Sequence, residues 1–159
     1  MSAILSTQNL VKKYGYKIVS NNISLTINKG DIYGFVGKNG AGKTTFMRQV
    51  LGLAFPDSGE ITLFGGEPLN TARKKIGSLI EFPSIYKNCT AYENMKRMAI
   101  LTGSSDKSVR KILDFVGLGN TGNKKAGQFS LGMRQRLGIA MALLGNPELL
   151  ILEEPINGL

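Results

Sequence analysis

A glycine-rich segment that precedes a helical pattern constrains the fold of this chain most strongly. Residues 37–45 read Gly-Lys-Asn-Gly-Ala-Gly-Lys-Thr-Thr and match the pattern G-x-x-x-x-G-K-S/T at Gly37, Gly42, Lys43 and Thr44. Glycines permit positive φ, and without side chains the backbone N–H groups of such a loop can converge on phosphate oxygens. The dipole of the following helix favours the same anion. The pattern therefore predicts a phosphate-binding loop between a strand and a helix.

The groups of this loop have distinct expected roles. Lys43 is expected to reach the β- and γ-phosphates, while the Thr44 hydroxyl binds Mg²⁺ and Thr45 donates near the α-phosphate. Backbone amides complete the cradle at the residues between Gly37 and Lys43, namely Asn39, Gly40, Ala41 and Gly42. A chance match is the alternative, because the chain contains 20 glycines. The motif alone indicates a P-loop NTPase, whether kinase, GTPase or ATPase.

Alternating patterns along the chain predict an α/β fold with a largely parallel sheet. Residues 4–10 and 18–27 alternate apolar and polar side chains, which predicts an antiparallel ribbon. Further strands are predicted at 31–36, directly before the loop, and at 61–64, 76–80 and 149–152. Helices are predicted at 43–53, 90–102, 105–116 and 131–144, with Thr90, Ser105 and Ser130 as N-caps and Gly103 and Gly117 as stops.

Two carboxylates follow the last of these strands. Glu153 and Glu154 come directly after the apolar run 149–152, which has the composition of a strand covered on both faces. The carboxyl end of such a strand lies beside the ligand in open α/β sheets. Glu153 could hold a water on Mg²⁺, and Glu154 could orient or deprotonate the attacking water. An exposed acidic turn is the alternative.

The composition excludes several kinds of chemistry. The chain contains no histidine, so Ser–His–Asp catalysis and histidine zinc sites are excluded, and its one cysteine, Cys89, cannot form an internal disulfide. The net charge of +9 is dispersed, without a basic tract interleaved with aromatics, so no nucleic-acid partner is expected. The same charge suits a membrane-embedded partner beside anionic lipid. No apolar run is long enough to cross a bilayer, and a cytoplasmic location is expected.

Three segments, in this order, resemble the ATP-binding domain family of ABC transporters. They are the loop at 37–45, the run Phe-Ser-Leu-Gly-Met-Arg-Gln-Arg at 129–136, and the strand ending in Glu-Glu-Pro. The signature loop of the family reads LSGGQ, and here Ser130 and Gly132 keep the positions expected to contact phosphate. Leucine and methionine replace its glycine and glutamine, which resembles the antibiotic-export branch of the bacitracin and lantibiotic-resistance type.

The resemblance assigns roles to further residues. Tyr14 looks like the aromatic residue that stacks on adenine, with ordinary packing as the alternative. Glu81 stands where the family carries its Q-loop glutamine, can approach Mg²⁺, and is common in the bacitracin-type branch. The segment 83–92 is then the expected contact with the coupling helix of a membrane subunit, or else a plain surface loop. Glu153 replaces the usual aspartate, and the longer side chain can weaken metal retention.

The fold and assembly implied by the resemblance follow the family. One P-loop NTPase domain over 1–159 is expected, with a core at 1–82 and 147–159, an N-terminal antiparallel ribbon and a helical subdomain at 83–146. Two such domains, identical or different, would sandwich two ATP molecules, each between the P-loop of one and Ser130 and Gly132 of the other. They would bind a transmembrane permease at the inner face of the cell membrane. ATP hydrolysis, with Glu154 activating water and Lys43 and Mg²⁺ stabilising the phosphoryl group, would drive export of a peptide antibiotic or similar amphiphile.

The resemblance covers all 159 residues but only the larger, N-terminal part of the family domain. Residues 157–159 look like the start of the D-loop, and the switch histidine of the family would follow later. We therefore expect marginal stability, and ATP binding with poor hydrolysis. Two other functions stay open: a nucleotide-binding regulatory module without turnover, and a soluble ABC ATPase unrelated to transport. The latter usually has long coiled coils or duplicated cassettes, which this chain lacks.

Overall fold

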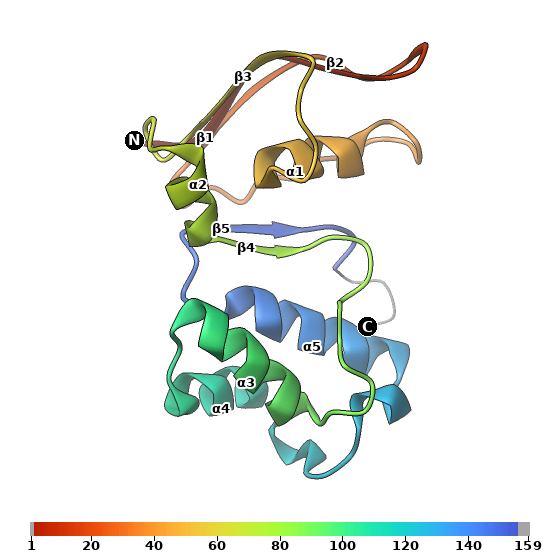
Figure 1. Cartoon of the computed structure of the whole chain (residues 1–159), viewed down its shortest axis with the longest axis vertical. Coiled ribbons are helices and arrows are strands. Elements are labelled where there is room, and N and C mark those ends of the chain that lie inside the picture. The colour runs from red at the N-terminus through yellow and green to blue at the C-terminus, as the bar shows by residue number, and fades with distance from the viewer. Residues whose placement is uncertain (1, 156–159) are drawn as a thin grey trace. The chain divides into compact units, whose positions relative to one another are not determined.

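A long antiparallel hairpin opens the chain, as the alternating residues predict (Figure 1). The computed structural model describes residues 2–155, and its contacts divide the chain into two compact units with the boundary between Ile76 and Gly77. In the first unit, β1 (Ala3–Tyr14) pairs antiparallel with both β2 (Lys17–Asn28) and β3 (Ser58–Leu63), in the order β2-β1-β3. Pairing with β3 reaches only as far as Val11, so the hairpin tip continues as a two-stranded ribbon.

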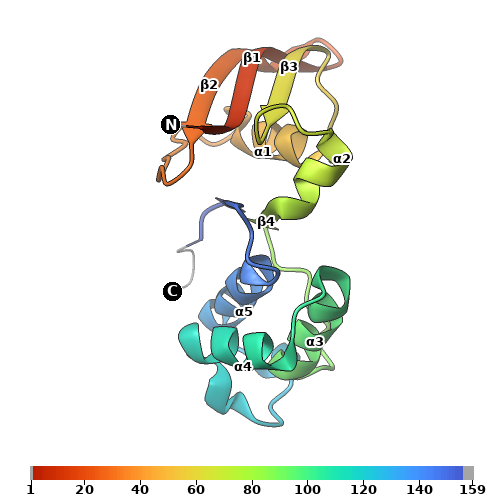
Figure 2. The same cartoon turned by 90° about the vertical axis from the view of Figure 1, so that its left-hand side faces the viewer.

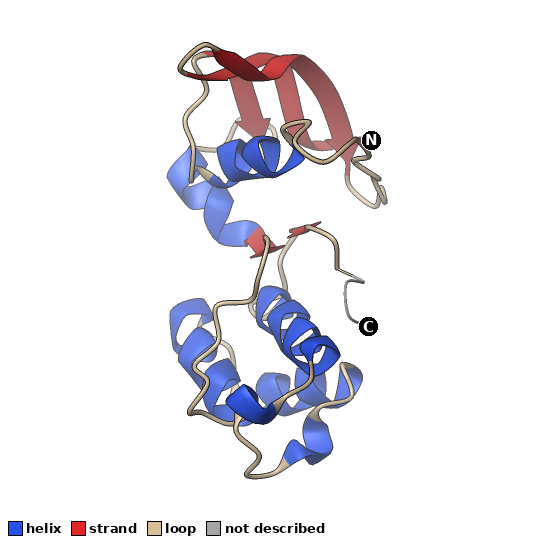
Figure 3. Ribbon diagram, turned by 90° about the vertical axis from the view of Figure 1, so that its right-hand side faces the viewer, coloured by secondary structure: helices blue, strands red, loops and turns tan. Residues whose placement is uncertain are grey.

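Helix α1 (Lys43–Leu51) lies along one face of this sheet (Figure 3). Phe46 and Val50 of the helix are buried, as are Leu10 and Leu63 of the sheet. A hydrogen bond of 3.3 Å from the Ser20 Oγ to the Gln49 Oε1 joins β2 to the helix. A short helix, α2 (Leu69–Ala72), and a 3-10 turn (Arg73–Lys75) complete the first unit.

Residues 31–36 form no strand in the described structure, so this prediction is wrong. A strand exists only where a neighbouring strand satisfies its backbone groups. Within the first unit both edges of β1 are occupied, by β2 and β3, and the segment pairs with neither. Ile32 and Val36 are almost fully exposed, at 103% and 94%, whereas Phe35 stacks on Phe46 with ring centroids 4.8 Å apart. Apolar composition thus indicated a preference for burial but supplied no pairing partner.

The second unit combines a small sheet with a helical cluster (Figure 2). Strands β4 (Ile76–Leu79) and β5 (Leu149–Leu152) lie side by side and run in the same direction. Helices α3 (Ala91–Thr102), α4 (Asp106–Phe115) and α5 (Leu131–Leu143) pack together, with 3-10 turns at Gly119–Thr121 and Ala126–Gln128. The buried cluster is formed mostly by residues of these helices, including Met95, Val109, Leu113, Leu137 and Ala140.

The helix starts in this unit follow the local signals in the sequence. The side chains of Thr90, Ser105 and Ser130 each accept a hydrogen bond from a backbone N–H in the first turn, which confirms the predicted N-caps. Gly103 caps the end of α3 with φ 67°, and Gly117 adopts φ 71° just beyond α4. Among residues 2–155, no helix is both long enough and apolar enough to cross a bilayer.

Candidate nucleotide-binding site

The predicted phosphate loop runs directly into α1. Gly40 and Gly42 adopt φ 80° and 90°, and Gly42 is the residue that precedes the helix. A Cβ on Gly42 would lie 1.9 Å from the carbonyl oxygen of Val19, so the loop packs against β2 where only glycine fits. The exposed stretch before it carries Gly37, Asn39, Gly40 and Ala41. The structure therefore places the predicted cradle residues on one continuous loop.

Lys43 folds back over this loop. Its ammonium Nζ donates to the carbonyl oxygens of Gly37, at 2.6 Å, and Lys38, at 3.0 Å. Thr44 and Thr45 follow in the first turn of α1 and are half-buried. That first turn contains no acidic residue, so nothing in it neutralises the positive end of the helix dipole. A lysine ammonium beside an uncompensated helix N-terminus suits a phosphate group.

Tyr14 is the last residue of β1 and pairs with Lys17 across the hairpin. Its side chain is 52% exposed, and the ammonium of Lys12 lies 5.3 Å from the ring centroid. The same hairpin contacts the phosphate loop, because Val19 of β2 approaches Gly42. Both the candidate base-stacking ring and the candidate phosphate cradle thus belong to the first unit.

The candidate metal ligands of the second unit meet at the ends of β4 and β5. The backbone N–H of Glu153 donates to the Leu79 carbonyl at 2.8 Å, and the Glu153 Oε2 accepts from the backbone N–H of Glu81 at 3.1 Å. The Gln135 Nε2 donates to the backbone carbonyl of Glu154 at 3.4 Å. Glu81 and Glu154 adopt φ 60° and 44°, left-handed values that are uncommon for residues other than glycine. Such strained positions are frequent at functional sites.

The donors available for a metal are hard oxygen atoms. No group of three or more Asp, Glu, Cys or His side chains that could enclose a metal occurs in the described part of the chain. This donor set fits Mg²⁺, which takes one or two protein carboxylates or hydroxyls and completes its shell with phosphates and water. Thr44, Glu81 and Glu153 carry oxygens of the required kind.

The signature residues lie at the start of α5. The Ser130 Oγ accepts the backbone N–H of Met133 at 3.1 Å, and Ser130 itself is exposed. Gly132 is half-buried in the first turn, which again contains no acidic residue, whereas Leu131 is 50% exposed. A helix N-terminus without acidic residues in its first turn favours an anion, and the contact of Ser130 and Gly132 with phosphate stays a prediction. The predicted D-loop residues 157–159 lie outside the described residues.

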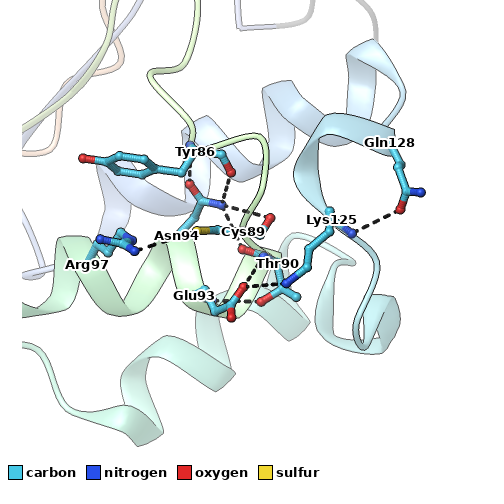
Figure 4. Close-up of polar contacts among 8 residues, drawn as sticks. All are labelled: Tyr86, Cys89, Thr90, Glu93, Asn94, Arg97, Lys125 and Gln128. Atoms are coloured by element: carbon cyan, nitrogen blue, oxygen red, sulfur yellow. Dashed lines mark hydrogen bonds and ion pairs between the residues drawn. The ribbon is translucent and has the colours of Figure 1, made fainter.

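Sequence reasoning missed Asn94, which is 1% exposed and holds the segment before α3 (Figure 4). Its Oδ1 accepts the backbone N–H of Tyr86 at 2.7 Å, and its Nδ2 donates to the carbonyls of Tyr86, at 3.1 Å, and Thr90, at 2.8 Å. The sequence gives no direct signal for this role, because neither the burial of Asn94 nor the backbone groups that it binds can be read from the residues.

The same segment is joined to the chain just before Ser130. The backbone N–H groups of Ala126 and Gly127 donate to the carbonyls of Cys89 and Lys87, each at 2.8 Å. Lys125 and Glu93 form an ion pair at 3.3 Å (Figure 4). The segment 83–92, the expected contact with a membrane subunit, is therefore bonded to the residues that precede α5.

A glycine-rich loop that ends in a lysine at a helix N-terminus defines the class of P-loop nucleotide-binding proteins. The family model described as ABC transporter matches residues 20–157, and the chain belongs to this family. This confirms the resemblance deduced from the three motifs.

Two relatives carry names of the expected branch. The bacitracin transport ATP-binding protein BcrA of Enterococcus faecalis is 51% identical over 163 aligned residues, covering 100% of this chain and 53% of that protein. The lantibiotic transport ATP-binding protein SrtF of Streptococcus pyogenes is 47% identical, covering 98% of this chain and 68% of that protein. The chain thus spans about half the length of BcrA.

Solved structures of the same kind confirm the predicted α/β P-loop NTPase fold. The ATP-binding subunit of an ABC transporter matches with a TM-score of 0.85 and 27% identity, covering 98% of this chain and 68% of the other. A dimeric, post-hydrolysis ATP-binding cassette bound to ADP and Pi matches with a TM-score of 0.84 and 26% identity, covering 98% and 75%.

Proposed function

We propose that this chain binds ATP with Mg²⁺ and belongs to the ATP-hydrolysing subunit of an ABC transporter. One observation carries the proposal: the Lys43 ammonium is held across a glycine-rich loop at the uncompensated N-terminus of α1. Backbone amides from Gly37 to Thr45 and the Lys43 ammonium bind the triphosphate, while Tyr14 stacks on the adenine base.

The remaining roles follow from the chemistry of each side chain. Thr44, Glu81 and Glu153 hold the metal, which when bound supplies positive charge to the β- and γ-phosphates. Glu154 orients the attacking water and accepts its proton. Lys43 stabilises negative charge on the transferred phosphoryl group.

The proposal includes a second copy or a homologous chain. Ser130 and Gly132 of one subunit contact the nucleotide held by the P-loop of the other, at the N-terminus of α5. The dimeric state of the solved cassette that is bound to ADP and Pi supports this arrangement. In this assembly 1–159 is part of one ATP-binding domain, with residues 83–146 as its helical subdomain.

A permease at the inner face of the cell membrane is the proposed partner, and its contact is the segment 83–92. A groove of about 380 Å³ in the second unit supports this surface, and it is lined partly by Phe82, Pro83, Ile85, Leu131 and Arg134. Phe82 is 79% exposed there. The names of BcrA and SrtF support a peptide antibiotic or similar amphiphile as the cargo.

The test is equilibrium titration of the chain with ATP in the presence of Mg²⁺. Lys43→Ala is expected to weaken binding about 10- to 100-fold, because charge-assisted hydrogen bonds contribute about 1.5–3 kcal/mol. Lys74→Ala, which removes an exposed lysine of the same unit, is the matched control. The proposal is overturned if the folded chain takes up no ATP, or if both variants bind equally well.

Regulation without turnover is the second candidate, and one observation favours it. The carboxylate of Glu153, which replaces the family aspartate, accepts the Glu81 N–H at 3.1 Å and is thereby partly engaged by protein. Phosphate release measured beside ATP binding separates the two functions. Release that Glu154→Gln abolishes supports hydrolysis, whereas binding without release supports the regulatory function.

A further inference from the structure

The tip of the β1–β2 hairpin projects beyond the third strand. The last β1–β3 pair joins Val11 to Ser58, whereas β1 continues to Tyr14 and pairs there with β2 alone. A two-stranded ribbon is only marginally stable in water. A ring carried on such a tip would lose considerable freedom on binding a base, which reduces affinity.

Asp57, the residue directly before β3, continues the contact with β1 beyond the last β1–β3 pair. Its backbone N–H donates to the Val11 carbonyl at 2.9 Å, and its Oδ2 accepts the backbone N–H of Lys13 at 2.6 Å. Its Oδ1 accepts from the Lys12 Nζ at 3.3 Å. A side chain thus supplies the acceptor that another strand residue would have provided. The Lys13 N–H, followed by the Lys12 ammonium, holds the pKa of Asp57 below its ordinary value of 3.8.

Lys12 connects this anchor to the aromatic ring. Its side chain is 15% exposed, which is low for a lysine, and its ammonium lies 5.3 Å from the Tyr14 ring centroid. The ammonium thus lies over one face of the ring, while Tyr14 stays 52% exposed. Attraction between an ammonium and an aromatic face restrains the ring further.

We propose that Asp57 and Lys12 are positioning residues for adenine, which hold Tyr14 in the orientation that stacks on the base of ATP. The proposal rests on the proposed function and deepens it, because it assigns base recognition to a chain of contacts from Asp57 through Lys12 to Tyr14. Asp57 and Lys12 act through the ring and do not themselves contact the nucleotide.

The test is a double-mutant cycle read with two ligands, ATP and inorganic tripolyphosphate, both with Mg²⁺. Tyr14→Ala is expected to weaken ATP binding about 5- to 100-fold, the range for loss of base–aromatic stacking. Asp57→Ala is expected to weaken it about 2- to 10-fold, through lost pre-organisation. Neither change affects tripolyphosphate, and in the Tyr14→Ala background Asp57→Ala adds less than about twofold.

Asp31→Ala is the matched control. Asp31 also accepts a backbone N–H at a strand end of this sheet, from Asn28 at 2.8 Å, but at the opposite end of β2 from Tyr14. It should leave the ratio of the two affinities unchanged. If Asp57→Ala does not fold, Lys12→Met keeps the apolar stem, removes the cation, and should show the same dependence on Tyr14.

The outcomes distinguish failure of the positioning role from failure of the proposed ATP binding. Equal losses for both ligands, or an undiminished effect of the Asp57 or Lys12 change in the Tyr14→Ala background, overturn the positioning role. ATP binding that still depends on Lys43 then leaves the proposed function standing. A folded chain that binds neither ligand overturns both.

Discussion

Replacing Asn94 by alanine is expected to release the segment from Tyr86 to Thr90 that precedes α3 (Figure 4). The amide of Asn94 accepts from the Tyr86 N–H at 2.7 Å and donates to the carbonyls of Tyr86 and Thr90 at 3.1 and 2.8 Å. After truncation the two carbonyls keep other partners, the Cys89 N–H at 3.0 Å and the Asn94 N–H at 3.1 Å. The Tyr86 N–H loses the Asn94 Oδ1 as its acceptor, so this N–H accounts for the largest part of the expected loss of stability.

The magnitude follows from these contacts. A lost hydrogen bond whose acceptor keeps another partner lowers stability by about 0.5–1.5 kcal/mol, and a desolvated donor without a partner by about 1–3 kcal/mol. Because Tyr86 is not fully enclosed, water relieves part of the second contribution. Asn94→Ala should therefore lower the free energy of unfolding by about 2–4 kcal/mol.

Asn94→Asp sharpens the argument because it preserves the shape of the side chain. It keeps the acceptor for Tyr86 but turns the donor toward Tyr86 and Thr90 into a carboxylate oxygen facing two carbonyls. At neutral pH this variant should be no more stable than Asn94→Ala, and it should recover partly on acidification, when the carboxyl group gains a proton.

Urea titration followed by circular dichroism gives the free energy of unfolding for each variant. The exposed Asn123 provides the control, and Asn123→Ala should change stability by less than about 0.5 kcal/mol. A loss below about 1 kcal/mol for Asn94→Ala would refute the reasoning, since it falls short of one orphaned buried donor. An Asn94→Asp variant more stable than Asn94→Ala at neutral pH would refute it equally.

Two further predictions concern the loop and the helical cluster. Gly42→Ala should lower the free energy of unfolding by about 2 kcal/mol or more, because φ is 90° and the added Cβ would lie 1.9 Å from the Val19 carbonyl oxygen. Gly40 has φ 80° but open space around it, so Gly40→Ala should lower the free energy of unfolding by only about 1–2 kcal/mol. The same urea titration measures both variants. The Lys96 ammonium, then the Tyr92 hydroxyl, lowers the pKa of Asp106 from 3.8 to about 2. The contribution of the ionised Asp106 to stability should be complete above pH 3.8 and should disappear as the pH falls toward 2. In a plot of the urea midpoint against pH, Asp106→Asn should remove the change over this range.

Local signals in the sequence predicted much of the fold. The alternation of apolar residues gave both hairpin strands, and Thr90, Ser105 and Ser130 marked helix starts because their side chains bond to N–H groups of the next turn. The strand at 31–36 failed because hydrophobicity does not specify which backbone will pair. The pairing of β4 with β5 is likewise non-local, and strand patterns alone did not specify it.

The candidate site divides in the same way. The phosphate loop was predictable, because Gly37, Lys43 and α1 are contiguous and their geometry is set locally. Asn94 and Asp57 were missed, since each acts on backbone groups that the sequence does not distinguish. The Lys13 N–H that Asp57 accepts is 44 residues away, and only the folded sheet brings the two together.

The meeting of Glu81 and Glu153 has a consequence for how the second unit assembles. These residues are 72 positions apart, and closing a flexible loop of that length costs about 4 kcal/mol in chain entropy. The apolar cluster from Ala91 to Leu144 lies entirely inside this loop, so its condensation shortens the effective span before the strands pair. The helices should therefore form first during folding. The contact between Glu81 and Glu153 should form last, and it should be the first to open when denaturant is added.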